Sequence, residues 1–280
     1  MPFDITPSET VLKYAPWSLS KANTAKDCPR KFYFNYVVKK KGVTNADALV
    51  GQATHSALEF ALEGRPPLRA IEFAMEKYPL TTNEQERVMA FQPAIENFLR
   101  SFKHYCTQHH AQPPQYEQKL AVDINGKAVA NFFDNKKVFL RGVLDIAVLF
   151  KRKPYALVLD HKTGKDRGLH YYAQQFLIYR ILMKAQYPNL TKILSGINWV
   201  KADRIDLGDF VDTPNIEGPM AAFIEFLNES TKDLGDLSEY RQNRLCDWCD
   251  YKSQCPMFNP KASADVIETE EDERTDLPTT

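Results

Sequence analysis

The sequence predicts an α/β fold with a mixed central sheet flanked by helices. Segments with helical spacing of apolar residues occupy the first 110 positions or so, and a run of strand-like segments follows them. Helical and strand-like segments then alternate toward the C-terminus. A chain of 280 residues, 44% of them hydrophobic, can bury a sizeable core. We therefore expect one domain over residues 1–264.

Three helices are expected before the strands. The first begins near Ser18 or Ser20, because either hydroxyl can cap the first free amides of a helix. The second passes through His55 and ends near Leu62. The third runs from Asn83 to about Gln108, where apolar residues recur at helical spacing, namely Val88, Phe91, Ile95, Phe98 and Phe102.

The middle of the chain is expected to form the sheet. Four strands come first, at Tyr116–Ile124, Lys127–Phe133, Val138–Phe150 and Tyr155–His161, and Asn125-Gly126 provides a hairpin turn between the first two. The remaining elements are a helix from Gln175 to about Ala185, strands at Ile193–Val200 and Arg204–Val211, and a helix at Glu217–Leu227.

Two acidic residues end apolar runs that are typical of buried strands. Asp145 ends Gly-Val-Leu-Asp, and Asp160 begins the triplet Asp160-His161-Lys162. Carboxylates at neighbouring strand ends suit a hard divalent cation. Strand alternation places Asp160 and Lys162 on one face, so the ammonium group can hold a water beside the metal. The alternative is a salt-bridged hairpin without catalytic function.

Four of the five cysteines have the spacing of a metal site. Cys246-x-x-Cys249 and Cys255 form a compact ligand loop near the end, and Cys28 lies near the start. A Cys-x-x-Cys pair lets two thiolates reach one centre, which fits an iron–sulfur cluster or structural zinc. Disulfides are not expected, because the N-terminus lacks the basic and apolar segments of a signal peptide. Cys106 remains as a separate core or surface thiol.

The order of these motifs resembles the RecB-like branch of the PD-(D/E)XK nuclease superfamily. That pattern has a helical histidine, G-x-x-D, D-x-K-T-G and Q-x-x-x-Y, which correspond here to His55, Asp145, residues 160–164, and the pair Gln175 and Tyr179. The match spans roughly residues 17 to 258. It implies a restriction-endonuclease-like core with a helical N-terminal insertion and a C-terminal cysteine loop.

The resemblance also implies roles for these residues. The ligands of Mn²⁺ or Mg²⁺ would be the side chains of His55, Asp145 and Asp160 together with the backbone carbonyl of His161. Lys162 would position the attacking water, and Gln175 and Tyr179 would orient that lysine or bind the DNA strand. Glu117, which opens the strand before Asp145, would reach the metal shell or the residues beside it.

In this branch, one cysteine ahead of the domain and three after it bind a 4Fe–4S cluster. The resemblance therefore implies a cluster on Cys28, Cys246, Cys249 and Cys255, which would clasp the two ends of residues 1–264. The segment Cys28-Pro-Arg-Lys-Phe32 matches the C-P-x-x-[FY] opening of that branch and supports this assignment.

The formal net charge of zero conceals an uneven distribution. Residues 265–280 hold seven acids and one arginine, so we expect a disordered acidic tail. Basic residues gather near the N-terminus among aromatic ones, and such a mixture can neutralise phosphates and stack bases. The alternative is that the aromatics belong to the core and the lysines face water. The expected DNA contacts are Lys21, Lys26, Arg30 and Lys31.

The resemblance implies metal-dependent exonuclease action on single-stranded DNA ends, in recombination, repair or CRISPR-type spacer processing. The alternative is a non-catalytic or helicase-dependent DNA-binding subunit. No Walker A string occurs, so a helicase or recombination protein would be a separate chain, and self-association is also allowed. No apolar run is long enough to span a membrane, and no motif of a sequence-specific reader occurs. We expect a cytoplasmic protein, in the host cytoplasm if it is virus-encoded.

Overall fold

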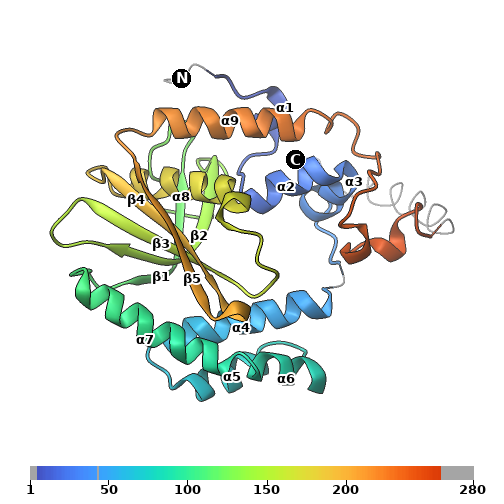
Figure 1. The fold of residues 1–280 in the computed structure, drawn as a ribbon. Coiled ribbons are helices and arrows are strands. Elements are labelled where there is room, and N and C mark those ends of the chain that lie inside the picture. The colour runs from blue at the N-terminus through green and yellow to red at the C-terminus, as the bar shows by residue number, and fades with distance from the viewer. Residues whose placement is uncertain (1–4, 43, 260–280) are drawn as a thin grey trace, which may run out of the picture. The chain divides into compact units, whose positions relative to one another are not determined.

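The computed structural model describes residues 5–42 and 44–259, which form two compact units (Figure 1). The first unit contains residues 5–19 and 46–229, and the second contains residues 20–45 and 230–259 apart from residue 43. The acidic tail lies outside the described residues. The single domain over residues 1–264 stays a prediction.

A mixed sheet of five strands forms the centre of the first unit, which confirms the predicted fold class. Each strand lies beside its neighbour in sequence, in the order β1-β2-β3-β4-β5. The pairs are antiparallel except for β3 and β4, which are parallel. The strands are β1 Gln115–Val122, β2 Leu140–Leu149, β3 Tyr155–Lys162, β4 Lys192–Trp199 and β5 Arg204–Asp212.

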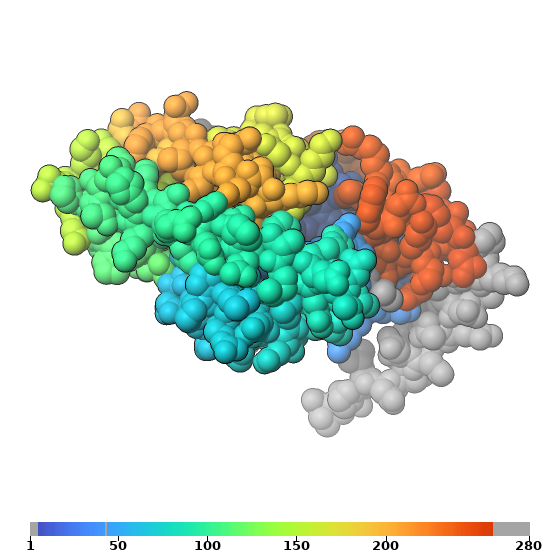
Figure 2. Space-filling view, turned by 60° about the horizontal axis from the view of Figure 1, so that its bottom comes forward, coloured from blue at the N-terminus to red at the C-terminus, as the bar shows by residue number. Residues whose placement is uncertain are grey.

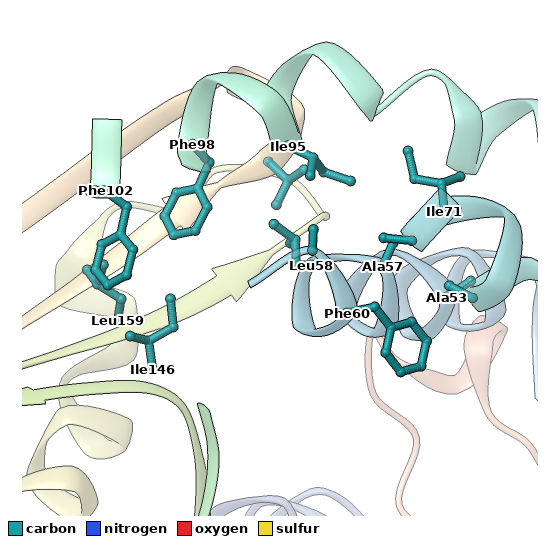
Figure 3. Close-up of a cluster of buried hydrophobic side chains, with 14 of the residues drawn as sticks. Ala53, Ala57, Leu58, Phe60, Ile71, Ile95, Phe98, Phe102, Ile146 and Leu159 are labelled. Carbon is teal, nitrogen blue, oxygen red and sulfur yellow. The ribbon is translucent and has the colours of Figure 1, made fainter. Parts of the chain in front are cut away.

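Helices between residues 46 and 108 form one apolar core with the sheet. These helices are α4 Ala46–Leu62, α5 Pro67–Glu76, α6 Thr82–Met89 and α7 Gln92–Gln108. Figure 2 shows this segment, from blue to green, as a continuous part of the surface. Ile146 and Leu159 of the sheet join Leu58, Ile95 and Phe98 in the core (Figure 3). This packing fixes α4 beside the ends of β2 and β3.

Helix α8 (Ala173–Gln186) lies against β1 and β2. Its contact with β2 is close at Gly142, where an added Cβ would lie 2.8 Å from Leu182 Cδ1. Helix α9 (Glu217–Thr231) buries residues at helical spacing. The start of the short helix α1 (Glu9–Lys13) contacts α9, because Ser8 N donates to Asn228 Oδ1 at 2.8 Å. The first turn of α8 carries Gln175, whose side chain reaches Asp160 of β3.

The long helix predicted from Asn83 to Gln108 is wrong, because the structure divides it into α6 and α7. The break falls at Ala90 and Phe91, and Pro93 follows in the first turn of α7. Proline has no amide proton to donate and fits the first turn of a helix. The apolar spacing is the same on both sides of the break, so the periodicity alone did not reveal it.

The strand predicted at Lys127–Phe133 is also wrong. Gly126, at φ +77°, makes the expected turn, but only an isolated bridge between Val122 and Ala128 follows it. Beyond that bridge, the side chains of Asn131 and Asp134 accept hydrogen bonds from nearby backbone amides. Such local bonds compete with strand pairing.

The second unit brings together segments that are far apart in the sequence. It contains most of α2 (Leu19–Asp27), α3 (Pro29–Phe32), a π-helical turn (Tyr33–Val37) and two 3₁₀ turns, Cys246–Trp248 and Lys252–Gln254. Asn243 Nδ2 donates to Asp27 O at 2.9 Å, and the Tyr251 hydroxyl donates to Lys40 O at 2.6 Å. Among the described residues, no helix is long and apolar enough to cross a membrane.

Candidate active site

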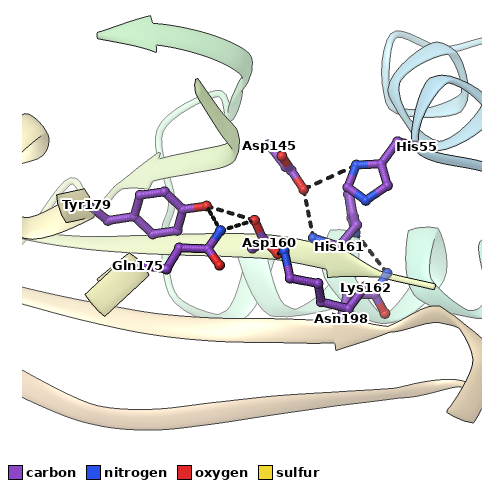
Figure 4. Close-up of polar contacts among 8 residues, drawn as sticks. All are labelled: His55, Asp145, Asp160, His161, Lys162, Gln175, Tyr179 and Asn198. Atoms are coloured by element: carbon purple, nitrogen blue, oxygen red, sulfur yellow. Dashed lines mark hydrogen bonds and ion pairs between the residues drawn. The ribbon is translucent and has the colours of Figure 1, made fainter. Parts of the chain in front are cut away.

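Asp145 lies within β2 and Asp160 near the end of β3, where the pairing of these two strands stops. The last pair is Ile146 with Leu159; Asp145 directly precedes Ile146 and Asp160 directly follows Leu159, so the antiparallel register brings the two carboxylates together (Figure 4). The backbone amide of His161 donates to Asp145 Oδ2 at 2.7 Å. This bond fixes the first carboxylate against the strand that carries the second.

The Asp160 carboxylate is buried in a network of polar side chains. One oxygen pairs with the Lys162 ammonium group. The other accepts hydrogen bonds from Tyr179 Oη at 2.7 Å and from Gln175 Nε2 at 2.5 Å. Because Gln175 and Tyr179 lie one turn apart on α8, that helix determines how the carboxylate is turned. The predicted Gln-x-x-x-Tyr pair therefore reaches the acid-x-lysine triplet through Asp160.

His55 reaches the same cluster from α4. Its Nδ1 lies 3.5 Å from Asp145 Oδ2. Burial lowers the pKa of His55, and the nearby negative charge of Asp160 opposes that shift. A neutral imidazole is the form that can bind a metal.

His161 faces away from Asp160, as strand alternation requires. Its buried ring meets Phe98 edge-on at 5.0 Å, and its Nδ1 is 3.0 Å from Asn198 Nδ2. Its Nε2 has no hydrogen-bond partner among the described residues. Asn198 on β4 thus holds the middle residue of the triplet, a role that sequence reasoning missed. The ligand role of the His161 carbonyl stays a prediction.

Glu117 lies beside the cluster in a strained conformation. Its φ of +45° is in the left-handed region, which residues other than glycine rarely adopt. Burial, together with the negative charges of Asp145 and Glu59, raises the pKa of Glu117 to about 7. The structure thus brings Glu117 to the predicted site.

Glu59 is a further acid that sequence reasoning missed. It lines the same pocket as His55, Glu117, Asp145 and Lys162. The available signal was its position four residues after His55, which places both side chains on one face of α4. With Glu59 included, the pocket holds more carboxylates than the predicted ligand set.

The donor chemistry of this pocket fits a hard divalent cation. Carboxylates crowd together here, and beside burial their negative charges raise the pKa values of Glu117 and Asp145. A cation would relieve that repulsion. Within residues 5–42 and 44–259, no three His, Cys, Asp or Glu side chains already lie in a metal-binding arrangement.

We expect Asp145→Asn to make the metal-free protein more stable at pH 8. Burial and the charge of Asp160 raise the pKa of Asp145 above its unfolded value of about 3.9. Between these two pKa values the folded chain retains a proton that the unfolded chain loses, so wild-type stability falls as pH rises. Asparagine has no such charge to bury.

The measurement is the melting temperature in EDTA from pH 5 to 8.5. The advantage of Asp145→Asn should grow by up to about 1.4 kcal/mol per pH unit within this window. Asp209→Asn, at an exposed carboxylate on β5, is the control and should show no comparable growth. An advantage of Asp145→Asn that stays constant across this range would contradict the assigned direction.

The four predicted cluster cysteines line one pocket of the second unit. Cys28, Cys246, Cys249 and Cys255 share it with aromatic and apolar side chains, including Phe34. Burial raises the pKa of the Cys249 and Cys255 thiols. Four cysteine thiols are suitable ligands for a metal ion or an iron–sulfur cluster. Among the described residues, no three His, Cys, Asp or Glu side chains already have the arrangement of a metal site. Cys106 lies in the first unit, where burial raises its pKa to about 11.

The predicted DNA-contacting residues all belong to the second unit. Lys26 is exposed, and Lys21 lies over the rings of Phe32 and Tyr36. Lys31 lines the cysteine pocket. DNA contact by these three lysines stays a prediction.

Arg30 differs from those lysines because it is only 6% exposed. Its guanidinium group lies 4.7 Å from the ring centres of both Tyr33 and Phe34, and its Nε donates to Tyr240 Oη at 3.2 Å. Phe34 is itself buried, so part of this aromatic group belongs to the core. These contacts give Arg30 a packing role, and DNA contact by it stays a prediction.

Comparison with solved structures found similar chains. A proposed exonuclease from Eubacterium rectale matches with a TM-score of 0.46 and 11% identity, over 87% of this chain and 90% of that one. The protein SSO0001 matches with a TM-score of 0.33 and 18% identity, over 85% of this chain and 96% of that one. A search of curated proteins found no match.

A family model gives the decisive comparison. The model of the PD-(D/E)XK nuclease superfamily matches residues 16–256, which include both acids, Lys162 and the four clustered cysteines. This match agrees with the mixed five-stranded sheet and confirms the predicted restriction-endonuclease-like fold. The chain therefore belongs to the PD-(D/E)XK nuclease superfamily.

Proposed function

We propose that this chain is a divalent-metal-dependent deoxyribonuclease that acts as an exonuclease on single-stranded DNA ends. The observation that carries the proposal is that Lys162, which pairs with Asp160, lines one pocket together with Asp145 and His55. A buried lysine–carboxylate pair at strand ends could serve structure alone. Here a second carboxylate, an imidazole and two further acids surround it, which favours chemistry on a phosphate.

Each side chain has a definite role in this proposal. His55, Asp145, Asp160 and the His161 carbonyl would hold Mn²⁺ or Mg²⁺, with Glu117 at the edge of the shell. The bound cation would supply Lewis acidity at the scissile phosphate. Lys162 would orient the attacking water and donate hydrogen bonds to it, while Gln175 and Tyr179 keep Asp160 turned toward the pocket.

We also propose that the second unit carries a 4Fe–4S cluster. All four cysteines line one pocket, and hydrogen bonds within this unit already join residues 26–40 to residues 239–251. Four thiolates would also satisfy zinc, so metal analysis must decide between them. This assignment belongs to the RecB-like branch of the superfamily, which we propose for this chain.

The alternative is a DNA-binding subunit that does not cleave, or that cleaves only beside a helicase in a separate chain. The complete set of His55, Asp145, Asp160 and Lys162 favours the enzyme, because a binding module has no need of it. We place the enzyme in the cytoplasm, in recombination, repair or spacer processing, and leave self-association as a further proposal.

We expect digestion of 5′- and 3′-labelled single strands in the presence of Mn²⁺. Because His55 contributes an imidazole, which suits softer cations than Mg²⁺ does, Mn²⁺ should support faster cleavage than Mg²⁺. Gel electrophoresis should show that one end-label is released early as a short product, and this label gives the polarity. EDTA should stop the reaction.

Circular single strands are the matched control for this digestion. An exonuclease should leave them intact while it degrades the linear form of the same sequence. Cleavage of the circle would replace the exonuclease proposal with an endonuclease. Binding to linear strands without any cleavage, in either metal, would favour the non-catalytic alternative.

A further inference from the structure

The segment that directly follows Lys162 ends in an exposed aromatic side chain. Residues 163–168 lead into a short 3₁₀ turn, Leu169–Tyr172, and Tyr171 in that turn is 57% exposed. A tyrosine ring exposed to this extent can pack against a bound ligand and bury a large apolar area there. Its position directly after the segment that carries Lys162 makes such a contact relevant to function.

Two ring contacts connect Tyr171 to the catalytic lysine. The Lys162 ammonium group lies 5.3 Å from the centre of the Tyr172 ring. The Tyr172 ring meets that of Tyr171 at 5.1 Å and packs edge-on against the buried Trp199 at 5.7 Å. Tyr171 therefore stands one aromatic ring away from the group proposed to handle the scissile phosphate.

Polar contacts hold this segment in place. Asp166 pairs with Arg204 of β5 at 2.5 Å, and Arg204 also pairs with Asp206, which accepts a hydrogen bond from Trp199 Nε1 at 2.8 Å. Gly168 permits the bend because its φ is +74°. The Asp166 carboxylate caps that bend by accepting a bond from Gly168 N at 2.8 Å. Tyr171 is thus presented from a fixed turn, which lowers the entropy cost of binding through it.

The charge around Tyr171 suits a polyanion. Arg167 donates to Tyr171 Oη at 2.8 Å, and its guanidinium group lies 4.7 Å from the ring centre. Lys165 is exposed on the same segment. The neighbouring acid, Asp166, forms its ion pair with Arg204. Cations beside an exposed ring can bind phosphates while the ring meets a base.

We infer that Tyr171 is a base-stacking residue that binds an unpaired nucleobase beside the scissile phosphate. The inference rests on the proposed nuclease function and names its substrate: a strand whose bases are free to stack. In a duplex, the faces of the bases are covered by their neighbours, so an internal base pair cannot use the ring. Tyr172 is a positioning residue that joins this ring to Lys162.

The test is fluorescence anisotropy with two labelled oligonucleotides of equal length and charge. One is oligo(dT), and the other carries abasic sites at every position. Ca²⁺ replaces Mn²⁺, and a gel confirms that the strands stay intact. Wild type should bind oligo(dT) about tenfold more tightly than the abasic strand. Tyr171→Ala should reduce this preference to near one, and Tyr171→Phe should keep it.

Phe133→Ala is the matched control. Phe133 is 66% exposed, meets Phe132 edge-on at 5.1 Å and lies 5.8 Å from the Lys119 ammonium group. It does not line the pocket that contains Lys162. This variant should keep the wild-type preference. If Tyr171→Ala also keeps it, the inference is overturned, even when wild type cleaves DNA. If the preference depends on Tyr171 but no metal supports cleavage, the stacking site stands and the catalytic proposal fails.

Discussion

Lys162→Ala and Asp160→Ala should each lower the rate of DNA cleavage by about a thousandfold or more. Lys162 is the cation beside the paired carboxylates, and Asp160 is the acid that α8 holds in place through Gln175 and Tyr179. Removal of either group leaves the scissile phosphate without a charge that the reaction needs. Initial rates on a labelled single strand with Mn²⁺ measure the effect.

Folding must be separated from chemistry in this experiment. Asp160→Ala leaves the buried Tyr179 hydroxyl without its acceptor, so Asp160→Asn, which retains an acceptor oxygen, accompanies it. Lys192→Ala is the control for the lysine. Lys192 pairs with Asp212 and lies opposite Tyr155, at the far end of the β3–β4 pair from Lys162.

All variants should retain the wild-type circular dichroism spectrum, and Lys192→Ala should cleave at nearly the wild-type rate. Near-normal activity of Asp160→Ala in Mn²⁺ would show that the catalytic assignment is wrong. If Lys192→Ala loses as much activity as Lys162→Ala, the cleavage rate depends on the total positive charge of the protein and not on Lys162 in particular.

The sequence was most informative where local and long-range signals agree. The predicted strands include all five observed ones, and nearly continuous apolar runs mark β2, β3 and β4, whose residues are mostly buried. The acids that those runs contain or precede followed from them: Asp145 lies within β2, and Asp160 lies near the end of β3. Antiparallel pairing then made Asp145 and Asp160 neighbours without further assumptions.

Errors arose where one local pattern permitted two structures. The apolar residues of Lys127–Phe133 suit a strand, but the amide of Phe133 bonds to the Asn131 side chain and that of Lys136 bonds to Asp134 instead. The apolar spacing over residues 83–108 suits one helix or two with the same buried face, and Pro93 begins the second. Periodicity reports which face is buried and does not report continuity.

Parts of the site could not be predicted because tertiary packing alone creates them. Asn198 contacts His161 across 37 positions of sequence, and nothing near either residue indicates this bond. Tyr172 gains its importance only when Trp199 supports its ring beside Lys162. Arg30 looked like a surface cation, yet aromatic side chains enclose it. The residue types predicted which chemical groups the site would contain, and the fold determined which further residues contact them.

The cysteine pocket should stabilise the second unit when its metal is bound. Cys28 and Cys246 are 218 positions apart, so a shared metal closes almost the whole chain into a loop and restricts the unfolded state. The Cys249 and Cys255 thiols have raised pKa values through burial, and metal binding would release their protons. The free energy of metal binding is then added to the free energy of folding.

Cys28→Ser and Cys249→Ser should therefore each lower the melting temperature by about 10 °C, with a loss of soluble yield. Cys106→Ser is the matched control, because Cys106 lies on α7 in the first unit, and it should cause a much smaller change.

Anaerobically purified wild type should be brown, with broad visible absorbance that dithionite bleaches, and should contain iron and acid-labile sulfide. The two destabilised variants should lose this colour, while Cys106→Ser should keep it. Colourless wild type that holds one zinc ion and no iron would replace the cluster with zinc and leave the nuclease proposal intact, whereas loss of colour in Cys106→Ser would move the fourth ligand to that residue.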